Sequence, residues 1–246
     1  MKLLTIIFSF MLFSCAGSFI GVCYDRIPRG EQIWKGRSHC DNCKRKLGPS
    51  ELIPVFSILF LRGRCKTCNC RIPATSTVIE IATAALSTLP IIVYGLSVQG
   101  IAFGLVTSIL IEIALLDMKT MEISNLACIL IGAAGIVLMF IKGSYISSLI
   151  GAVCISVPFL ILALYGGMGM GDVKLMAAVG ILLGWEKTLL AAFLGILVGC
   201  VAATIIKFKT KREWKSEIAF GPYLCIGTYL AMLCGDSVIS WYLSLL

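Results

Sequence analysis

The sequence is short of charge. Only 14% of its 246 residues are Asp, Glu, Lys or Arg, whereas 59% are hydrophobic. A soluble domain has roughly 25% charged and 45–50% apolar residues, so this chain has too few polar side chains to cover a water-facing surface. The composition therefore excludes a soluble globular enzyme, a disordered chain and a secreted disulfide-rich mini-protein.

Histidine is almost absent, and two common enzyme motifs are missing. His39 is the only histidine, which argues against a zinc hydrolase of the His-Glu-x-x-His kind. The glycine-rich run 166–171 has no strand before it and no Gly-Lys-Ser/Thr after it, so it is not a nucleotide-binding loop. No segment alternates with a period of two, which disfavours a transmembrane β-barrel.

The sequence is rich instead in uncharged apolar runs of about 20 residues, the length that crosses a bilayer as a helix. They lie at residues 3–23, 72–98, 100–116, 123–141, 146–165, 188–206 and 218–235. A shorter run, 175–184, needs its flanks in order to cross. The first run, with Cys15, loosely resembles a lipoprotein signal peptide, but it continues to Cys23 and fits a first membrane helix better.

Basic residues gather in two segments. Eleven lie between Arg26 and Arg71, and five lie between Lys207 and Lys215. Because Lys and Arg mark the cytoplasmic side, both segments are expected there. Both can be cytoplasmic only if the run 175–184 also crosses, which places both termini outside. We therefore predict an all-α polytopic membrane protein with about eight transmembrane helices.

Five of the twelve cysteines are clustered in the first basic segment. They form two Cys-x-x-Cys pairs and one further thiol: Cys40, Cys43, Cys65, Cys68 and Cys70. The two pairs have the spacing of a structural tetrahedral Zn²⁺ site. Disulfides and unliganded thiols are the alternatives, although cytoplasmic thiols are kept reduced. Whether Cys70 or His39 joins the site stays open, and the other seven cysteines are expected in the core.

These patterns divide the chain into three parts. Residues 1–23 are predicted to form the first transmembrane helix, and residues 24–71 a small zinc-ribbon-like cytoplasmic domain inserted after it. Residues 72–246 are predicted to form a membrane-embedded domain of about seven helices. Within the loop, the apolar stretch 52–61 is too short to cross and is expected at the membrane surface.

Two aspartates fall at the predicted cytoplasmic ends of membrane helices. Asp117 ends the third span, and Asp172 follows the glycine run and opens the next helix. Carboxylates at the rim of a helix bundle are costly and usually mark function. If the two meet, they share a proton, so one can take a proton from water while the other donates to a carbonyl oxygen, as in aspartic proteases. Alternatively, Asp172 only caps a helix and Asp117 is an ordinary interfacial residue.

Three other charged residues are open to two interpretations each. Lys174 is expected to pair with a carboxylate or with a lipid phosphate. Glu80 and Glu112 lie inside predicted spans, where each is either a functional group or a hydrogen-bonded structural one.

Five landmarks, all in the expected order, give the chain a resemblance to the type IV prepilin peptidases. They are the segments 17–28, 40–68, 114–117, 169–175 and 220–224. Segment 169–174 reads Gly-x-Gly-Asp-x-Lys, and segment 220–222 reads Phe-Gly-Pro. The chain departs from the family at Ser124, where a proline is usual, and at Gly21, where an asparagine is usual.

The resemblance implies a membrane aspartic peptidase of the GxGD type in the bacterial cytoplasmic membrane. Its catalytic residues would be Asp117 and Asp172. The supporting residues would be Gly169, Gly171, Lys174, Gly221 and Pro222. It would remove the basic leader of type IV prepilins or pseudopilins after a glycine, on the cytoplasmic side, and then N-methylate the new terminus with S-adenosylmethionine.

The resemblance identifies no cofactor ligands. No Rossmann unit is present to hold S-adenosylmethionine, and Glu80 is a candidate for its site. No nucleic-acid partner is expected, and the oligomeric state and the pilus or secretion system served stay open. A peptidase that has lost methylation and a membrane transporter with a regulatory zinc loop are the alternative functions.

Overall fold

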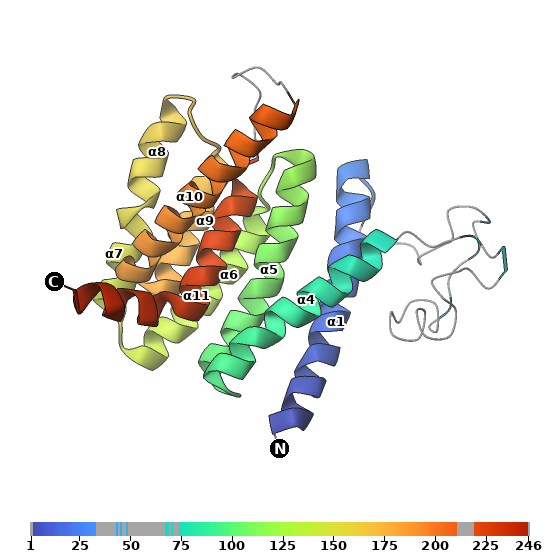
Figure 1. The fold of residues 1–246 in the computed structure, drawn as a ribbon, viewed down its shortest axis with the longest axis horizontal. Coiled ribbons are helices and arrows are strands. Elements are labelled where there is room, and N and C mark those ends of the chain that lie inside the picture. The colour runs from blue at the N-terminus through green and yellow to red at the C-terminus, as the bar shows by residue number, and fades with distance from the viewer. Residues whose placement is uncertain are drawn as a thin grey trace. The chain divides into compact units, whose positions relative to one another are not determined.

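The structure is a computed structural model, shown in Figure 1. It describes residues 2–32, 43, 45, 48, 67, 68, 70, 74–210 and 219–245. These residues form helices and no strands, so the all-α class is confirmed for the described part of the chain. They divide into two compact units, Met1–Leu86 and Ser87–Leu246.

The first unit contains α1 (Lys2–Arg26), the short 3-10 helix η1 (Ile27–Arg29) and the beginning of α4 (Ala74–Tyr94). Helices α1 and α4 approach closely at Gly17, where an added Cβ would lie 2.7 Å from the Cα of Glu80. Small residues let membrane helices approach in this way, because no side chain separates their backbones.

The second unit contains the end of α4 and every later described helix. These are α5 (Val98–Thr120), α6 (Asn125–Lys142), α7 (Tyr145–Cys154), α8 (Ser156–Leu164), α9 (Met170–Leu183), α10 (Trp185–Thr210) and α11 (Gly221–Leu243). Helices α7 and α8 follow one another with a break at Ile155 and together form one apolar segment.

Among the described residues, seven helical segments are long and apolar enough to cross a membrane. They are Leu3–Arg29, Thr75–Tyr94, Val98–Thr120, Asn125–Lys142, Tyr145–Leu164, Trp185–Ile206 and Gly221–Leu243. Each contains most of one long apolar run of the sequence, so the prediction of a polytopic membrane protein is confirmed. Helix α9 has only 14 residues and is not among them, so the eighth crossing and the orientation that depends on it stay predictions.

Helix α9 is the central helix of the second unit. It packs against α6, α7, α8, α10 and α11, and its fully buried side chains include Leu175, Met176 and Val179. Glycines allow this crowding: a Cβ on Gly180 would overlap the carbonyl oxygen of Gly151 in α7, and one on Gly135 in α6 would lie 2.7 Å from the nitrogen of Leu182. Fourteen residues reach about 21 Å, so neighbouring helices rather than length hold α9 in the bundle.

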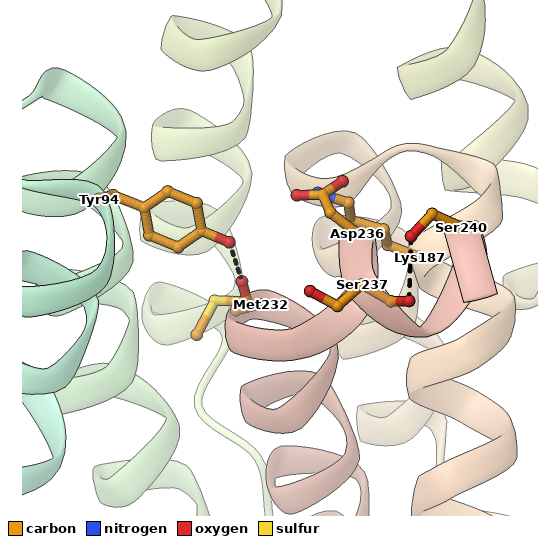
Figure 2. A network of polar contacts seen from close by, with 6 residues as sticks. All are labelled: Tyr94, Lys187, Met232, Asp236, Ser237 and Ser240. Carbon is orange, nitrogen blue, oxygen red and sulfur yellow. Dashed lines mark hydrogen bonds and ion pairs between the residues drawn. The ribbon is translucent and has the colours of Figure 1, made fainter.

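Polar contacts join the helices at the end of the second unit where α4 finishes and α10 begins. The Tyr94 hydroxyl donates to the backbone carbonyl of Met232, 2.6 Å away (Figure 2). Lys187 in α10 and Asp236 in α11 form an ion pair with an N–O distance of 2.7 Å. Figure 1 shows that α11 changes direction in its C-terminal part, and a side chain bound to a helix carbonyl is one recognised cause of such a bend.

The predicted cytoplasmic zinc-ribbon-like domain and the surface stretch 52–61 lie largely outside the described residues, as does the end of the second basic segment. The boundaries predicted at residues 23 and 71 therefore stay predictions.

Candidate active site

Asp117 lies in the last turn of α5 and reaches the first turn of α11. Helix α5 ends because Met121 adopts a left-handed backbone, with φ of 53°, and returns its N–H to the carbonyl of Asp117. The Asp117 side chain is 5% exposed. Its Oδ2 accepts a hydrogen bond of 3.0 Å from the N–H of Gly221. The first N–H groups of a helix have no partner within the helix, so Asp117 caps α11.

The contact with Asp117 leaves no space for a side chain at Gly221. An added Cβ there would lie 2.6 Å from Oδ2 of Asp117, closer than real Cβ contacts. Pro222 follows in the first turn of α11, where its missing N–H costs nothing. The Phe-Gly-Pro motif therefore gives α11 a start that accepts a carboxylate from α5.

Asp172 lies in the first turn of α9, after the glycine run. Gly169 is the N-cap residue in extended conformation, and its carbonyl accepts the N–H of Asp172 at 3.2 Å. The Asp172 side chain is 6% exposed. Its Oδ1 is buried and has no hydrogen-bond partner among the residues that the structure describes. A helix N-terminus favours a negative charge, but an unpartnered buried oxygen is costly.

The fold brings the two aspartates together. Their carboxylates are close enough to interact electrostatically, and the thiol of Cys225, on the next turn of α11 after Gly221, interacts with both. Asp117 and Asp172 come from different helices, 55 positions apart in the sequence. Helix capping alone does not require this meeting, and the paired-carboxylate and the capping interpretations both stay predictions.

Ile123, in the segment between α5 and α6, fills the space beside both glycine motifs. An added Cβ on Gly171 would lie 2.9 Å from the Cβ of Ile123, and one on Gly221 would lie 3.3 Å from its Cδ1. Ile123 therefore packs against the first turns of α9 and α11 at once. Sequence reasoning missed this role, as it missed Cys225, because no local pattern distinguishes either residue from other apolar positions.

Lys174 has a different partner from those expected. Its Nζ donates to the side-chain oxygen of Asn125, 2.9 Å away, at the first residue of α6. The sequence predicted a carboxylate or a lipid phosphate. The hydrogen bond joins the starts of α6 and α9, so Lys174 connects the segment that follows Asp117 to the helix that carries Asp172.

The other candidate acids lie elsewhere. Glu80 belongs to α4 in the first unit, where it is 4% exposed and interacts with the side chain of Ser18. Glu112 is half-buried in α5, about one turn and a half before Asp117.

The predicted zinc site is only partly within the described residues. Cys43 and Cys68 are described, whereas Cys40 and Cys65 are not, so the four-cysteine arrangement is not tested. The thiol of Cys68 donates to the sulfur of Cys70, 3.0 Å away. In the described part of the chain, no three His, Cys, Asp or Glu side chains form a metal-binding group.

The prediction for the seven scattered cysteines was right for some and wrong for others. Cys23, Cys128 and Cys225 are buried, and Cys154 is partly buried. The other three are exposed on apolar helices: Cys15, Cys200 and Cys234. An apolar run predicts a helix in lipid, but a membrane helix also turns apolar residues outward, so the run does not show which residues face the protein core.

Residues 11–94 match the bacterial peptidase A24 N-terminal domain, and residues 104–204 match the type IV leader peptidase family. A prepilin leader peptidase/N-methyltransferase of Bacillus subtilis (strain 168) is 34% identical over 99% of both chains. No solved structure is significantly similar.

Two further relatives carry the same name. The protein of Aeromonas salmonicida (strain A449) is 32% identical over 85% of this chain and 75% of its own. The protein of Pseudomonas aeruginosa is 30% identical over 92% of this chain and 89% of its own. The match to the type IV leader peptidase family, residues 104–204, includes both Asp117 and Asp172.

Proposed function

Because the chain belongs to the prepilin leader peptidase/N-methyltransferase family, we propose that it removes the leader peptide of type IV prepilins or pseudopilins and methylates the new amino terminus. The observation that carries the peptidase part is the meeting of Asp117 and Asp172, both buried. Burial of two interacting acids without a cationic partner has a clear use in proton transfer to and from a substrate.

In the proposed mechanism the two carboxylates share one proton and act as a unit. The ionised carboxylate takes a proton from a water molecule, whose oxygen attacks the carbonyl carbon of the scissile peptide bond. The protonated carboxylate donates to the carbonyl oxygen. When the tetrahedral intermediate collapses, the C–N bond breaks and the amine leaves with a proton. The unpartnered Oδ1 of Asp172 supports this mechanism, because no described protein group competes with water or substrate for it.

The position of the aspartates along their helices supports cleavage at a membrane face. Asp117 is three residues before the end of α5, and Asp172 is the third residue of α9. A substrate whose apolar helix lies in the bilayer would present its leader junction at that depth. Bare glycine backbone at positions 169, 171 and 221 allows close approach of a peptide, and a glycine before the cut would reduce crowding. We propose the cytoplasmic face of the bacterial inner membrane, from the basic segments.

Methyl transfer requires a donor, and S-adenosylmethionine would supply an electrophilic methyl group on a positively charged sulfur. Among the described residues of the matched N-terminal domain, Glu80 is the one buried acid, since Asp25 and Glu31 are exposed. A buried carboxylate fits the positive charge that donor and acceptor bring to this reaction. The described residues therefore fit the positively charged groups that take part in this methyl transfer.

We also propose a structural Zn²⁺ held by the four cysteines at positions 40, 43, 65 and 68. The support is the spacing of the two pairs and the donor chemistry of clustered thiols, seen at Cys68 and Cys70. Metal analysis of the purified protein should find one zinc per chain, which is lost in the Cys40→Ser/Cys43→Ser variant. The Cys70→Ser variant should keep its zinc, and a metal-free wild-type protein would show that the proposal is wrong.

The experiment that tests the main proposal is incubation of the purified protein, in detergent or nanodiscs, with a prepilin, with and without S-adenosylmethionine. Mass measurement of the product should show loss of the leader in both reactions and addition of one methyl group only with the donor. An intact prepilin in both reactions would refute the peptidase. Leader loss without methylation would leave a peptidase alone.

A further inference from the structure

Glu80 lies inside the packing of α1 against α4 and is poorly neutralised there. Its side chain is 4% exposed. Ser18 is the hydrogen-bonding side chain that it meets among the described residues. A carboxylate has about four acceptor positions, so one hydroxyl leaves most of them unused. Acids within membrane helices are costly and usually functional.

A second polar group, on the same face of α4 as Glu80, lacks a hydrogen-bond partner among the described residues. Thr83 follows Glu80 by three residues and is 0% exposed, yet its hydroxyl has no hydrogen-bond partner in the described part of the chain. A threonine within a helix often bonds the carbonyl four residues earlier, and this one does not. Gly17 of α1 contacts both residues: its added Cβ would lie 3.1 Å from the Cβ of Thr83.

A buried unpartnered hydroxyl next to a buried, under-bonded carboxylate points to a ligand that bears positive charge and hydrogen-bond donors. A freed amino terminus is such a group, because an α-ammonium has a pKa of about 8 and carries three N–H donors. Glu80 is the seventh residue of α4, about 9 Å along the helix from its first residue. This depth is close to the helix end that follows the cytoplasmic loop.

We propose that Glu80 is the catalytic base of the methyl transfer and binds the amino terminus that cleavage releases. The inference rests on the proposed function. The ammonium gives one proton to the Glu80 carboxylate. The nitrogen lone pair of the resulting amine then forms a bond to the methyl carbon of the donor, and the C–S bond breaks with its electron pair left on sulfur. The product is a methylated ammonium beside a protonated Glu80, which returns its proton to water.

The test compares Glu80→Gln with wild type, and uses Ser18→Ala and Glu80→Asp as matched controls. Gln keeps the size of Glu80 and the hydrogen bond to Ser18 but cannot accept the proton. Each purified protein is assayed for leader loss without donor, for methyl addition with donor and for S-adenosylmethionine binding by calorimetry. Thermal unfolding is measured alongside to check that each variant is folded.

We expect Glu80→Gln to remove the leader at the wild-type rate and to bind S-adenosylmethionine within a few-fold of wild type, while methylation falls about 10²-fold or more. Its residual methylation should rise with pH, because the amine then loses its proton to solvent. Ser18→Ala should methylate within a few-fold of wild type, since it keeps the carboxylate. Glu80→Asp should recover part of the rate lost in Glu80→Gln.

Three results with the Glu80 variants would overturn the inference. Normal methylation by Glu80→Gln would show that the carboxylate is not needed, and weak donor binding by the same variant would move Glu80 to the donor site. Loss of cleavage and methylation together, with a lower unfolding temperature in Glu80→Gln and in Glu80→Asp, would make Glu80 structural. A wild-type protein that cleaves but never methylates refutes the methyl-transfer half of the proposed function instead, and the inference with it.

Discussion

Acidic residues differ in burial and in pairing between the two ends of the second unit. At one end, Asp236 is paired with Lys187 and its side chain is 67% exposed. At the other end, Asp117 and Asp172 are only 5% and 6% exposed, and no cation pairs with them among the described residues. Solvent and a lysine stabilise the first charge at little cost. The second pair is held against its own repulsion, which supports the proposal that these acids perform chemistry.

The largest effect should come from removing either carboxylate of the buried pair, Asp117 or Asp172. Asp117→Asn and Asp172→Asn keep the size of the side chain. At position 117, asparagine can still accept the hydrogen bond from the N–H of Gly221. Neither can share a proton with its partner, so we expect leader cleavage to fall about 10³-fold or more. Mass measurement of the cleaved prepilin over time gives the rate.

The matched control for these variants is Asp236→Asn at the opposite end. It removes an equal charge from the same unit and should leave the cleavage rate unchanged, because Asp236 pairs with Lys187 at the other end of α11. Near-normal cleavage by Asp117→Asn or Asp172→Asn would contradict the dyad. An equal loss in Asp236→Asn would show that the assay responds to general damage to the bundle.

A smaller effect is expected from one added methyl group. Gly221→Ala places a Cβ 2.6 Å from Oδ2 of Asp117, so the carboxylate or the start of α11 must move. A displacement approaching 1 Å costs about 10²-fold in rate when it misaligns a catalytic group. Cleavage rates of purified Gly221→Ala and wild type, measured at saturating substrate, check this.

Gly235→Ala is the matched glycine at the other end of α11. Its Cβ would meet only the flexible chain of Lys187, at 3.4 Å, an ordinary contact. We expect cleavage by this variant within a few-fold of wild type. Equal rates for Gly221→Ala and Gly235→Ala would show that the tight packing at Asp117 does not position the carboxylate.

Sequence patterns predicted the helices well because apolar runs and charge placement are local signals. The apolar runs 100–116 and 123–141 correspond to α5 and α6. Three of the four ends of these runs lie within two residues of the helix ends. The span 218–235 was too short, since α11 continues to Leu243. Asp236 ended the apolar run in the sequence, but a pairing with Lys187 keeps this charge in the helix.

The site was predicted in part, and the missing part is tertiary. The sequence alone shows Asp117 and Asp172 as acids at helix ends. No local rule predicts that the N–H of Gly221 donates a hydrogen bond to Asp117. Ile123 and Asn125 acquire their roles from α9 and α11, which the sequence does not place beside them. The environment of Glu80 likewise depends on Gly17, 63 positions earlier, and on how two helices cross.

The smallest effect should come from the ion pair itself. Lys187→Met keeps the apolar stem that covers Gly235 and removes only the charge. Because Asp236 is largely exposed, we expect water to screen the pair, and a double-mutant cycle with Asp236→Asn should give a coupling free energy of about 0.5 kcal/mol. Thermal or denaturant unfolding of the wild type, the two single variants and the double variant measures it. The coupling should weaken as salt is added.

A coupling above about 2 kcal/mol would contradict this expectation and would show that the Lys187–Asp236 pair is shielded from solvent, as the aspartate end is. Both ends of the second unit would then contain shielded charges. Burial alone would no longer distinguish the end with Asp117 and Asp172 from the end with Asp236. If the coupling is small, the distinction holds: exposed charge at one end is neutralised at little cost, while the buried acids at the other end have no cationic partner among the described residues.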